Sequence, residues 1–312
     1  MTSPSPALPT PSPAIHTQDL AKRYGTTVAL RALTMTVERG EVFGFLGPNG
    51  AGKTTAVKLL LGLARPTAGE AWILGAPLGD LATRRRIGYL PELFRYQPWL
   101  RAREVLALHC ALGKIDRATW HEEIRAALET IGLAERANDR VGTFSKGMQQ
   151  RLGLGVALLG TPDLVLLDEP TSALDPVGRR DVRAIIAGLK ARGVTVFLNS
   201  HLLTEVERVC DRVAIVDRGA VVAEGRVDDI GAGAVVRIHV TGLAATDHAA
   251  LSRFGPLEVA GDWLRVRGLT DGAVPDLVAE IVARGGRVHA VHPERATLEE
   301  RFLTLLGEGK PS

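Results

Sequence analysis

The spacing of apolar and polar side chains predicts strands in the first part of the chain. Residues 28–37 (VALRALTMTV) alternate between apolar and polar positions, as a half-buried β-strand does. Residues 41–47 (EVFGFLG) form a short apolar run that ends in glycine, and residues 54–63 (TTAVKLLLGL) are predicted to be helical. The pattern therefore predicts a buried strand that leads through a glycine loop into a helix.

A helical period replaces this pattern between about residues 93 and 160. Apolar side chains there follow the i, i+4, i+8, i+11 spacing of one helix face, and charged side chains occupy the other face. These apolar residues are Trp120, Ile124, Leu128 and Ile131. Residues 161–230 then return to short apolar runs separated by amphipathic stretches. Alternating strands and helices predict a parallel sheet covered by helices on both faces, and residues 93–160 are predicted to be a helical insert.

The last 80 or so residues show a different order of elements. Their pattern is typical of strand, helix, two strands, helix and strand, which is the order of a ferredoxin-like α+β domain. Thr297 and Glu300 match a capping box and predict one final helix. We expect residues 14–230 to form a large α/β domain and residues 231–312 to form a small accessory domain that is regulatory or dimer-forming.

Composition narrows the class of protein. The chain has 312 residues and 46% hydrophobic content, which is ample for a core without disulfides. Cys110 and Cys210 stand alone, so a disulfide framework and a zinc site are both disfavoured. The net charge is only +3, and the densest basic run, residues 83–86, is interpreted as a solvated strand edge. We therefore expect no nucleic-acid partner.

Neither a membrane span nor a secretory signal is predicted. No stretch approaches the ~18 apolar residues that cross a bilayer. Residues 1–13 are rich in Pro, Ser and Thr, without the basic and apolar regions of a signal peptide, and are expected to be a disordered tail. We expect a cytoplasmic chain that associates with a membrane only through a partner.

Residues 47–55 (GPNGAGKTT) match the phosphate-binding pattern GxxxxGK[ST] between the predicted strand and helix. The glycines let backbone amides surround a phosphate, and the helix N-terminus adds its positive end. Lys53 is expected to reach the β- and γ-phosphates, and Thr54 to hold Mg²⁺. The position between a predicted strand and a predicted helix disfavours the alternative, a glycine turn that only caps a helix. The expected binding residues are Gly47, Pro48, Asn49, Gly50, Ala51, Gly52, Lys53, Thr54 and Thr55.

Two carboxylates end the apolar run at residues 163–170 (DLVLLDEP). Asp168 is placed to bind Mg²⁺, and Glu169 to orient and deprotonate an attacking water. His201 follows another predicted strand and is a candidate contact to the γ-phosphate. A lone histidine is more often a structural group, so its neighbours in the sequence decide its interpretation.

A helix with a Ser-Lys-Gly start is predicted at residues 144–151 (FSKGMQQR). The first amides of a helix have no intrahelical partner, so Ser145, Lys146 and Gly147 form a possible anion site. Nothing nearby in the sequence supplies that anion.

Five motifs together resemble the ATP-binding subunits of ABC transporters over about residues 15–230. They are the phosphate loop, residues 144–151, residues 164–170, residues 172–175 (SALD) and His201. The resemblance implies a P-loop NTPase fold, with a RecA-like core, an antiparallel β subdomain and a helical subdomain.

The resemblance also implies roles for individual residues. Residues 144–151, including Met148, are similar to the signature motif that binds the γ-phosphate held by a second subunit. Residues 172–175 are similar to the loop that faces this subunit. His201 corresponds to the switch histidine, and Tyr24 to the aromatic residue that stacks on adenine.

Some positions depart from the family pattern. Glu92 stands where the family usually has a glutamine that contacts Mg²⁺, and Lys146 and Met148 stand where Gly and Gln are usual in the signature. With LNSH before the switch histidine and the C-terminal α+β region, these variants resemble the branch that works with type-two export permeases. That branch exports drugs, lipids, polysaccharides or ions.

We therefore expect an ATP-hydrolysing subunit that acts on ATP with Mg²⁺ and drives a separate integral-membrane permease at the inner face of the cell membrane. One phosphate loop and one signature make two half-sites, so a second ATP-binding subunit is expected, most simply in a homodimer. One alternative is a soluble ABC ATPase acting on ribosomes or DNA. Fewer than 90 residues separate positions 55 and 144, and they contain no sustained heptads. Both features disfavour the soluble ATPase. A regulatory module without turnover is disfavoured by Glu169 and His201.

Overall fold

The computed structural model describes residues 12–172, 174–230, 234–269, 271–295 and 297–307. Its contacts divide the chain into two compact units, Met1–Gly225 and Arg226–Ser312. The boundary after Gly225 lies five residues before the boundary expected from the sequence, which follows residue 230. The tail predicted at residues 1–13 falls outside the described residues, except for its last two.

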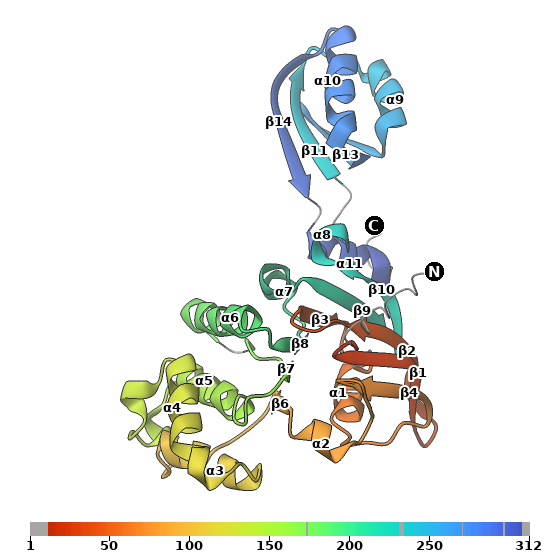
Figure 1. Cartoon of the computed structure of the whole chain (residues 1–312). Coiled ribbons are helices and arrows are strands. Elements are labelled where there is room, and N and C mark those ends of the chain that lie inside the picture. Colours follow the sequence, from red (N-terminus) through yellow and green to blue (C-terminus); the bar gives the residue numbers. More distant parts are fainter. Residues whose placement is uncertain (1–11, 173, 231–233, 270, 296, 308–312) are drawn as a thin grey trace, which may run out of the picture. The chain divides into compact units, whose positions relative to one another are not determined.

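A ten-stranded sheet forms the centre of the first unit (Figure 1). Its strand order is β5-β4-β1-β2-β10-β9-β3-β8-β7-β6. The antiparallel part contains β1 (Ile15–Tyr24), β2 (Thr27–Val37), β4 (Ala68–Ile73) and β5 (Ala76–Pro77). The parallel part contains β3 (Val42–Leu46), β6 (Ile87–Leu90), β7 (Leu164–Asp168), β8 (Thr195–Asn199) and β9 (Arg212–Asp217). Strand β10 (Ala220–Arg226) lies between the two parts and pairs in parallel with β2. The predicted parallel sheet and the antiparallel subdomain are both confirmed.

The central parallel strands explain the continuous apolar runs in the sequence. Every residue of β3, β7 and β8 is buried, because a parallel sheet is covered on both faces. Phe43, Phe45 and Phe197 are among the largest fully buried side chains, and the ring of Phe197 lies 6.1 and 5.3 Å from the other two. This aromatic cluster anchors the strands that carry the candidate site.

Helices account for most of the remaining part of the first unit. They are α1 (Lys53–Leu60), α2 (Leu81–Arg84), α3 (Ala102–Leu112), α4 (Trp120–Thr130), α5 (Lys146–Ala157), α6 (Pro176–Ala191) and α7 (Leu203–Val209). The predicted helical insert contains α3, α4 and α5, and its apolar face buries Leu128 and Ile131. The strand edge predicted at residues 83–86 is wrong, because residues 83–84 end α2, residues 85–86 form a turn, and β6 begins only at Ile87. Asp80 caps α2 there by accepting the Thr83 amide at 2.7 Å.

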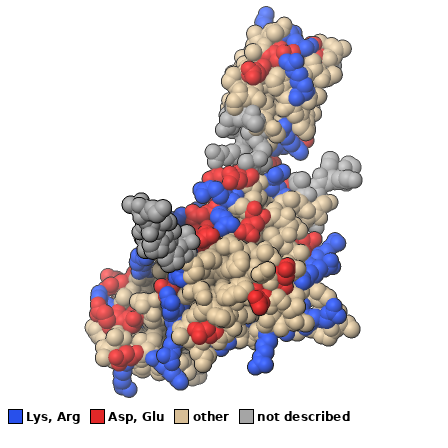
Figure 2. Space-filling view, turned by 45° about the vertical axis from the view of Figure 1, so that its right-hand side comes forward, with Lys and Arg blue, Asp and Glu red and all other residues tan. Residues whose placement is uncertain are grey.

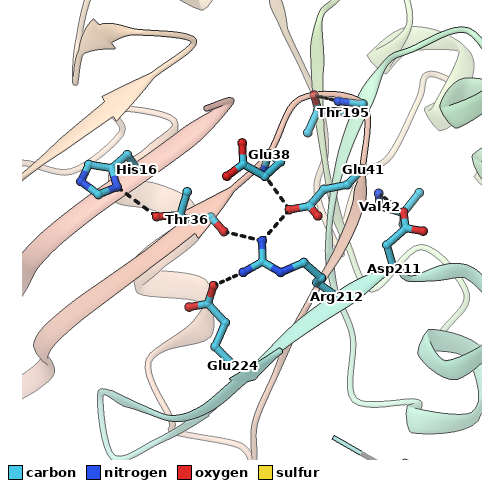
Figure 3. A network of polar contacts seen from close by, with 10 residues as sticks. His16, Thr36, Glu38, Glu41, Val42, Thr195, Asp211, Arg212 and Glu224 are labelled. Atoms are coloured by element: carbon cyan, nitrogen blue, oxygen red, sulfur yellow. Dashed lines mark hydrogen bonds and ion pairs between the residues drawn. The ribbon is translucent and has the colours of Figure 1, made fainter. Parts of the chain in front are cut away.

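A polar network joins the two parts of the sheet at the amino end of β9 (Figure 3). The Arg212 guanidinium donates to the carbonyl of Thr36 on β2 at 3.1 Å and to the carboxylates of Glu41 and Glu224 at 3.2 and 2.5 Å. Burial raises the pKa of the Glu41 carboxyl, and the charge of Arg212 opposes this shift. Arg212 therefore stabilises a partly buried carboxylate while connecting β2, β9 and β10.

The second unit contains a four-stranded antiparallel sheet in the order β12-β13-β11-β14. Its elements are α8 (Val227–Ile230), β11 (Ala234–Thr241), α9 (His248–Leu251), β12 (Leu257–Ala260), β13 (Trp263–Leu269), α10 (Val274–Ala283), β14 (Arg287–Arg295) and α11 (Leu298–Leu306). From β11 to β14 the order is the predicted ferredoxin-like one. Thr297 and Glu300 each accept the other's amide at 3.2 Å, so the predicted capping box is present.

No helix in the described ranges combines the length and the apolar character needed to cross a membrane.

Candidate nucleotide-binding site

The predicted chemical groups meet at the carboxyl ends of four neighbouring parallel strands. Strands β3, β8, β7 and β6 are adjacent in this order. The phosphate loop follows β3, His201 follows β8, Asp168 ends β7 and Glu92 follows β6. Because parallel strands end at the same edge of a sheet, residues more than 100 positions apart lie side by side. This edge is the usual ligand-binding position of open α/β sheets.

Three glycines of the phosphate loop are required by its geometry. Gly50 and Gly52 have φ angles of +83° and +101°, which L-residues with a Cβ rarely adopt. A Cβ on Gly47 or Gly52 would lie 2.3 Å from a backbone carbonyl oxygen, that of Val216 or Ala29 respectively. A Cβ on Gly50 would meet nothing within 4 Å. The loop therefore packs closely against the sheet at its two ends and stays open at Gly50.

Lys53 begins α1 with a largely buried side chain. Its Nζ donates to the carbonyls of Gly47 and Pro48 at 2.7 and 3.2 Å. Burial lowers the pKa of Lys53, whereas the nearby carboxylates of Glu169, Asp168 and Glu92 act in the opposite direction. The first amides of α1 have no intrahelical partner, and Thr54 is exposed in this first turn. The phosphate loop and the first turn of α1 thus present an ammonium group and free amides to an anion.

Asp168 is a buried carboxylate beside this ammonium group. Asn199 on β8 donates from its Nδ2 to Asp168 Oδ1 at 2.5 Å. Burial raises the pKa of Asp168, and the charges of Glu92 and Glu169 add to this shift, while Asn199 and Lys53 oppose it. The neighbouring groups of the folded chain therefore do not fully offset the cost of keeping the Asp168 carboxylate negatively charged.

Glu169 has a strained backbone at the position expected to act on water. Its φ of +52° is unusual for a residue other than glycine, and its amide donates to the Asn199 carbonyl at 2.9 Å. The side chain is 9% exposed, and its Oε2 lies 2.8 Å from Nδ1 of His201. That contact lacks hydrogen-bond geometry, so Oε2 has no donor. Strain of this kind is typical of functional sites, because the surrounding structure must maintain it.

The residues present fit a divalent cation held jointly with a phosphate. In the described part of the chain, no three His, Cys, Asp or Glu side chains are arranged to enclose a metal ion. Mg²⁺ usually binds one or two carboxylates together with phosphate oxygens and water. Two buried oxygens, Glu169 Oε2 and Asn199 Oδ1, lack a hydrogen-bond donor, so a cation and its waters would satisfy them. Thr54, Asp168 and Glu92 stay the predicted ligands.

The signature segment starts α5 with free amides, as predicted. Ser145 is the N-cap, and its Oγ accepts the Met148 amide at 3.2 Å. Ser145 and Lys146 are exposed, and a Cβ on Gly147 would meet only Ser145 Oγ, at 3.9 Å. Within the described ranges, no hydrogen bond joins this segment to the phosphate loop of the same chain. Its role in a second subunit's site stays a prediction.

Tyr24 ends β1 with 47% of the residue exposed, and Lys22 Nζ lies 4.8 Å from its ring centroid. Its exposed ring is available for stacking, and the adenine contact stays a prediction.

Sequence reasoning missed Asn199. This residue stands directly opposite Asp168 in the β7–β8 pairing, and its carbonyl and amide contact Glu169 and Asp168. The polar residue that ends the apolar run at 194–199 is a signal that would have identified it.

A glycine loop between a buried strand and a helix, with an acidic pair at a neighbouring strand end, defines the class of P-loop nucleoside triphosphatases. Residues 30–172 match the family model described as ABC transporter. An uncharacterised ABC transporter ATP-binding protein of Nostoc is 39% identical, covering 95% of this chain and 90% of the relative. The chain belongs to the ABC transporter family, as an ATP-binding subunit with ATPase activity.

Two further comparisons agree with this assignment. A Nod factor export ATP-binding protein I of Burkholderia lata is 38% identical, over 69% of this chain and 71% of the relative. A solved ATP-binding subunit of an ABC transporter superimposes with a TM-score of 0.62 at 33% identity, over 70% of this chain and 91% of that one.

Proposed function

We propose that this chain hydrolyses ATP as the energy-supplying subunit of an export system whose permease is a separate protein. One observation carries the proposal: the phosphate loop, the carboxylates of Asp168 and Glu169, and His201 converge at the ends of three adjacent strands. The relative named for Nod factor export and the resemblance to the type-two export branch support the direction of transport.

The residues at this edge of the sheet have separate roles in ATP binding and hydrolysis. Amides of residues 47–55 and the ammonium group of Lys53 bind the phosphates. Thr54, Asp168 and Glu92 would hold Mg²⁺, which would supply positive charge to offset the negative charge of the phosphates. Glu169 accepts a proton from the attacking water, and its acceptor oxygen Oε2 already lacks a hydrogen-bond donor.

His201 and Tyr24 complete the contacts to ATP from the same chain. His201 contacts the γ-phosphate from the end of β8, where its side chain is 54% exposed and therefore accessible. Tyr24 stacks on adenine.

A second ATP-binding subunit supplies the signature half of each site. Gly147 is not required by the fold of its own chain, since a Cβ there has room. A glycine without a local reason is explained by close approach of a ligand to the backbone. We infer that amides at residues 145–147 approach the γ-phosphate bound by the partner, most simply in a homodimer.

The surface supports a protein partner better than a nucleic acid. Leu93, Trp99 and Leu112 flank or belong to the helical part and are 86%, 67% and 68% exposed, a high exposure for large apolar side chains. Figure 2 shows Lys and Arg side chains interspersed with Asp and Glu on the visible face, without one continuous basic area. We propose that the permease contacts the helical part, which would hold this chain at the inner face of the membrane.

Glu169→Gln tests the proposed hydrolysis. It keeps the shape of the side chain and removes the base, so we expect turnover to fall by about 10²–10⁴-fold while ATP affinity is retained. Because ATP then persists, size-exclusion chromatography should detect a nucleotide-bound dimer.

The matched control is Glu129→Gln, on the exposed face of α4, which should hydrolyse ATP like the wild type. Wild-type turnover in Glu169→Gln would contradict the assignment of the base. Lys53→Ala should weaken ATP binding, and an unchanged affinity would contradict the role of the phosphate loop.

A further inference from the structure

A largely buried ion pair connects helices α6 and α7. Arg183 on α6 directs its Nη1 to both carboxylate oxygens of Glu205 on α7, at 2.9 and 2.6 Å. Glu205 is 5% exposed, and the Arg183 side chain is 22% exposed. Water competes weakly for groups that are this buried, so the pair constrains the two helices more than an exposed pair does.

Apart from this pair, helix α7 is held by Val206, which packs against Gly44 of β3. It spans only seven residues, and only Glu205 and Val206 are buried. No side chain caps its N-terminus, where Leu202 occupies the N-cap position. The helix begins two residues after His201, so its position sets the course of the backbone that carries this histidine.

Helix α6, in contrast, is firmly attached to the core. Val182, Ile186 and Leu189 are at most 1% exposed. Asp175 caps its first turn by accepting the Gly178 amide at 2.7 Å. This helix is therefore a rigid support from which Arg183 holds α7.

We propose that Arg183, through its ion pair with Glu205, is a positioning residue that sets the imidazole of His201 against Glu169 and the γ-phosphate. His201 is 54% exposed, so its own packing does not fix it, and its Nδ1 lies 2.8 Å from Glu169 Oε2. The proposal rests on the proposed ATPase function and adds two residues that lie outside the groups assigned above to ATP, Mg²⁺ or the attacking water.

The double variant Arg183→Met/Glu205→Leu, in the full chain, is the main test. Removing both charges avoids an unpaired buried charge, so the fold should be kept, as circular dichroism and thermal unfolding will show. We expect kcat to fall about tenfold because the imidazole is displaced. The KM for ATP should stay unchanged, because the phosphate loop is untouched. Arg180→Met, on the same helix with a 70% exposed side chain, should behave like the wild type.

Two further variants separate positioning from general stability. Arg183→Lys keeps the charge and should recover most of kcat. When the double change is added to His201→Ala, it should cause no further loss, because its effect passes through that histidine. Glu205→Gln alters no side-chain volume and should also lower kcat at constant KM.

Wild-type kcat in the folded double variant or in Glu205→Gln would overturn the proposal. A further tenfold loss in the His201→Ala background would do the same. Failure of the ATPase function itself is distinguishable, because the wild-type chain would then release no phosphate from ATP, whereas failure of the positioning role leaves wild-type hydrolysis intact.

Discussion

Gly147→Ala separates the stability of this chain from its activity. The glycine lies in the first turn of α5 with an ordinary helical backbone, and an added Cβ would have only Ser145 Oγ near it, at 3.9 Å. Alanine restricts the unfolded chain more than glycine does, so the variant should be about 0.4–1 kcal/mol more stable. For a unit of this size the melting temperature should rise by about 1–4 °C.

The same methyl group should harm catalysis if a second subunit's γ-phosphate approaches the Gly147 amide. A hydrogen bond to a charged group is worth about 1.5–3 kcal/mol, so losing it should lower kcat about ten- to a hundredfold. Urea unfolding without nucleotide measures the stability, and phosphate release at saturating ATP measures the activity.

Gly188→Ala is the matched control for both measurements. Gly188 lies in α6, where a Cβ would meet nothing within 4 Å. This control should gain similar stability and keep wild-type ATPase activity. If Gly147→Ala also keeps wild-type activity, no ligand approaches this glycine. If Gly147→Ala instead lowers the free energy of unfolding, the methyl group does not fit beside Gly147 and the reasoning on its packing is wrong.

Two other substitutions test the electrostatics. Asp168→Asn should stabilise the nucleotide-free chain by about 0.5–2 kcal/mol near neutral pH, since it removes a buried carboxylate from a functional site. Because the folded-state pKa of Asp168 is raised above 3.8, the wild type loses stability as pH rises through 3.8 towards that higher value. The difference between the variants should therefore vanish well below pH 3.8, and urea unfolding across the pH range measures it. Arg212→Met should lower the free energy of unfolding by about 2 kcal/mol, because Glu41 loses its charged partner. Adding Glu41→Gln should recover part of this loss. Full additivity of the two changes would contradict the coupling between these residues.

Local patterns in the sequence determined much of the fold. The strand at residues 41–47, the phosphate loop and the helix after it are continuous in the chain, so residue period and glycine spacing were enough to predict them. The capping box of Thr297 and Glu300 is local in the same sense, because a capping residue bonds an amide three positions away. The short helix at Leu81–Arg84 was missed, although its cap, Asp80, was visible in the sequence.

Only the tertiary structure decided which of these elements are neighbours. The order β3-β8-β7-β6 brings Asn199 to Asp168 and His201 to Glu169, and no residue period encodes that order. The positive φ of Glu169 and the ion pair of Arg183 with Glu205 likewise depend on groups contributed by other strands and helices. The sequence by itself thus determined the chemical groups and the local elements that carry them, because these follow from residues close together in the chain. Their distances, burial and altered pKa values arise only when long-range strand pairing excludes water from that edge of the sheet.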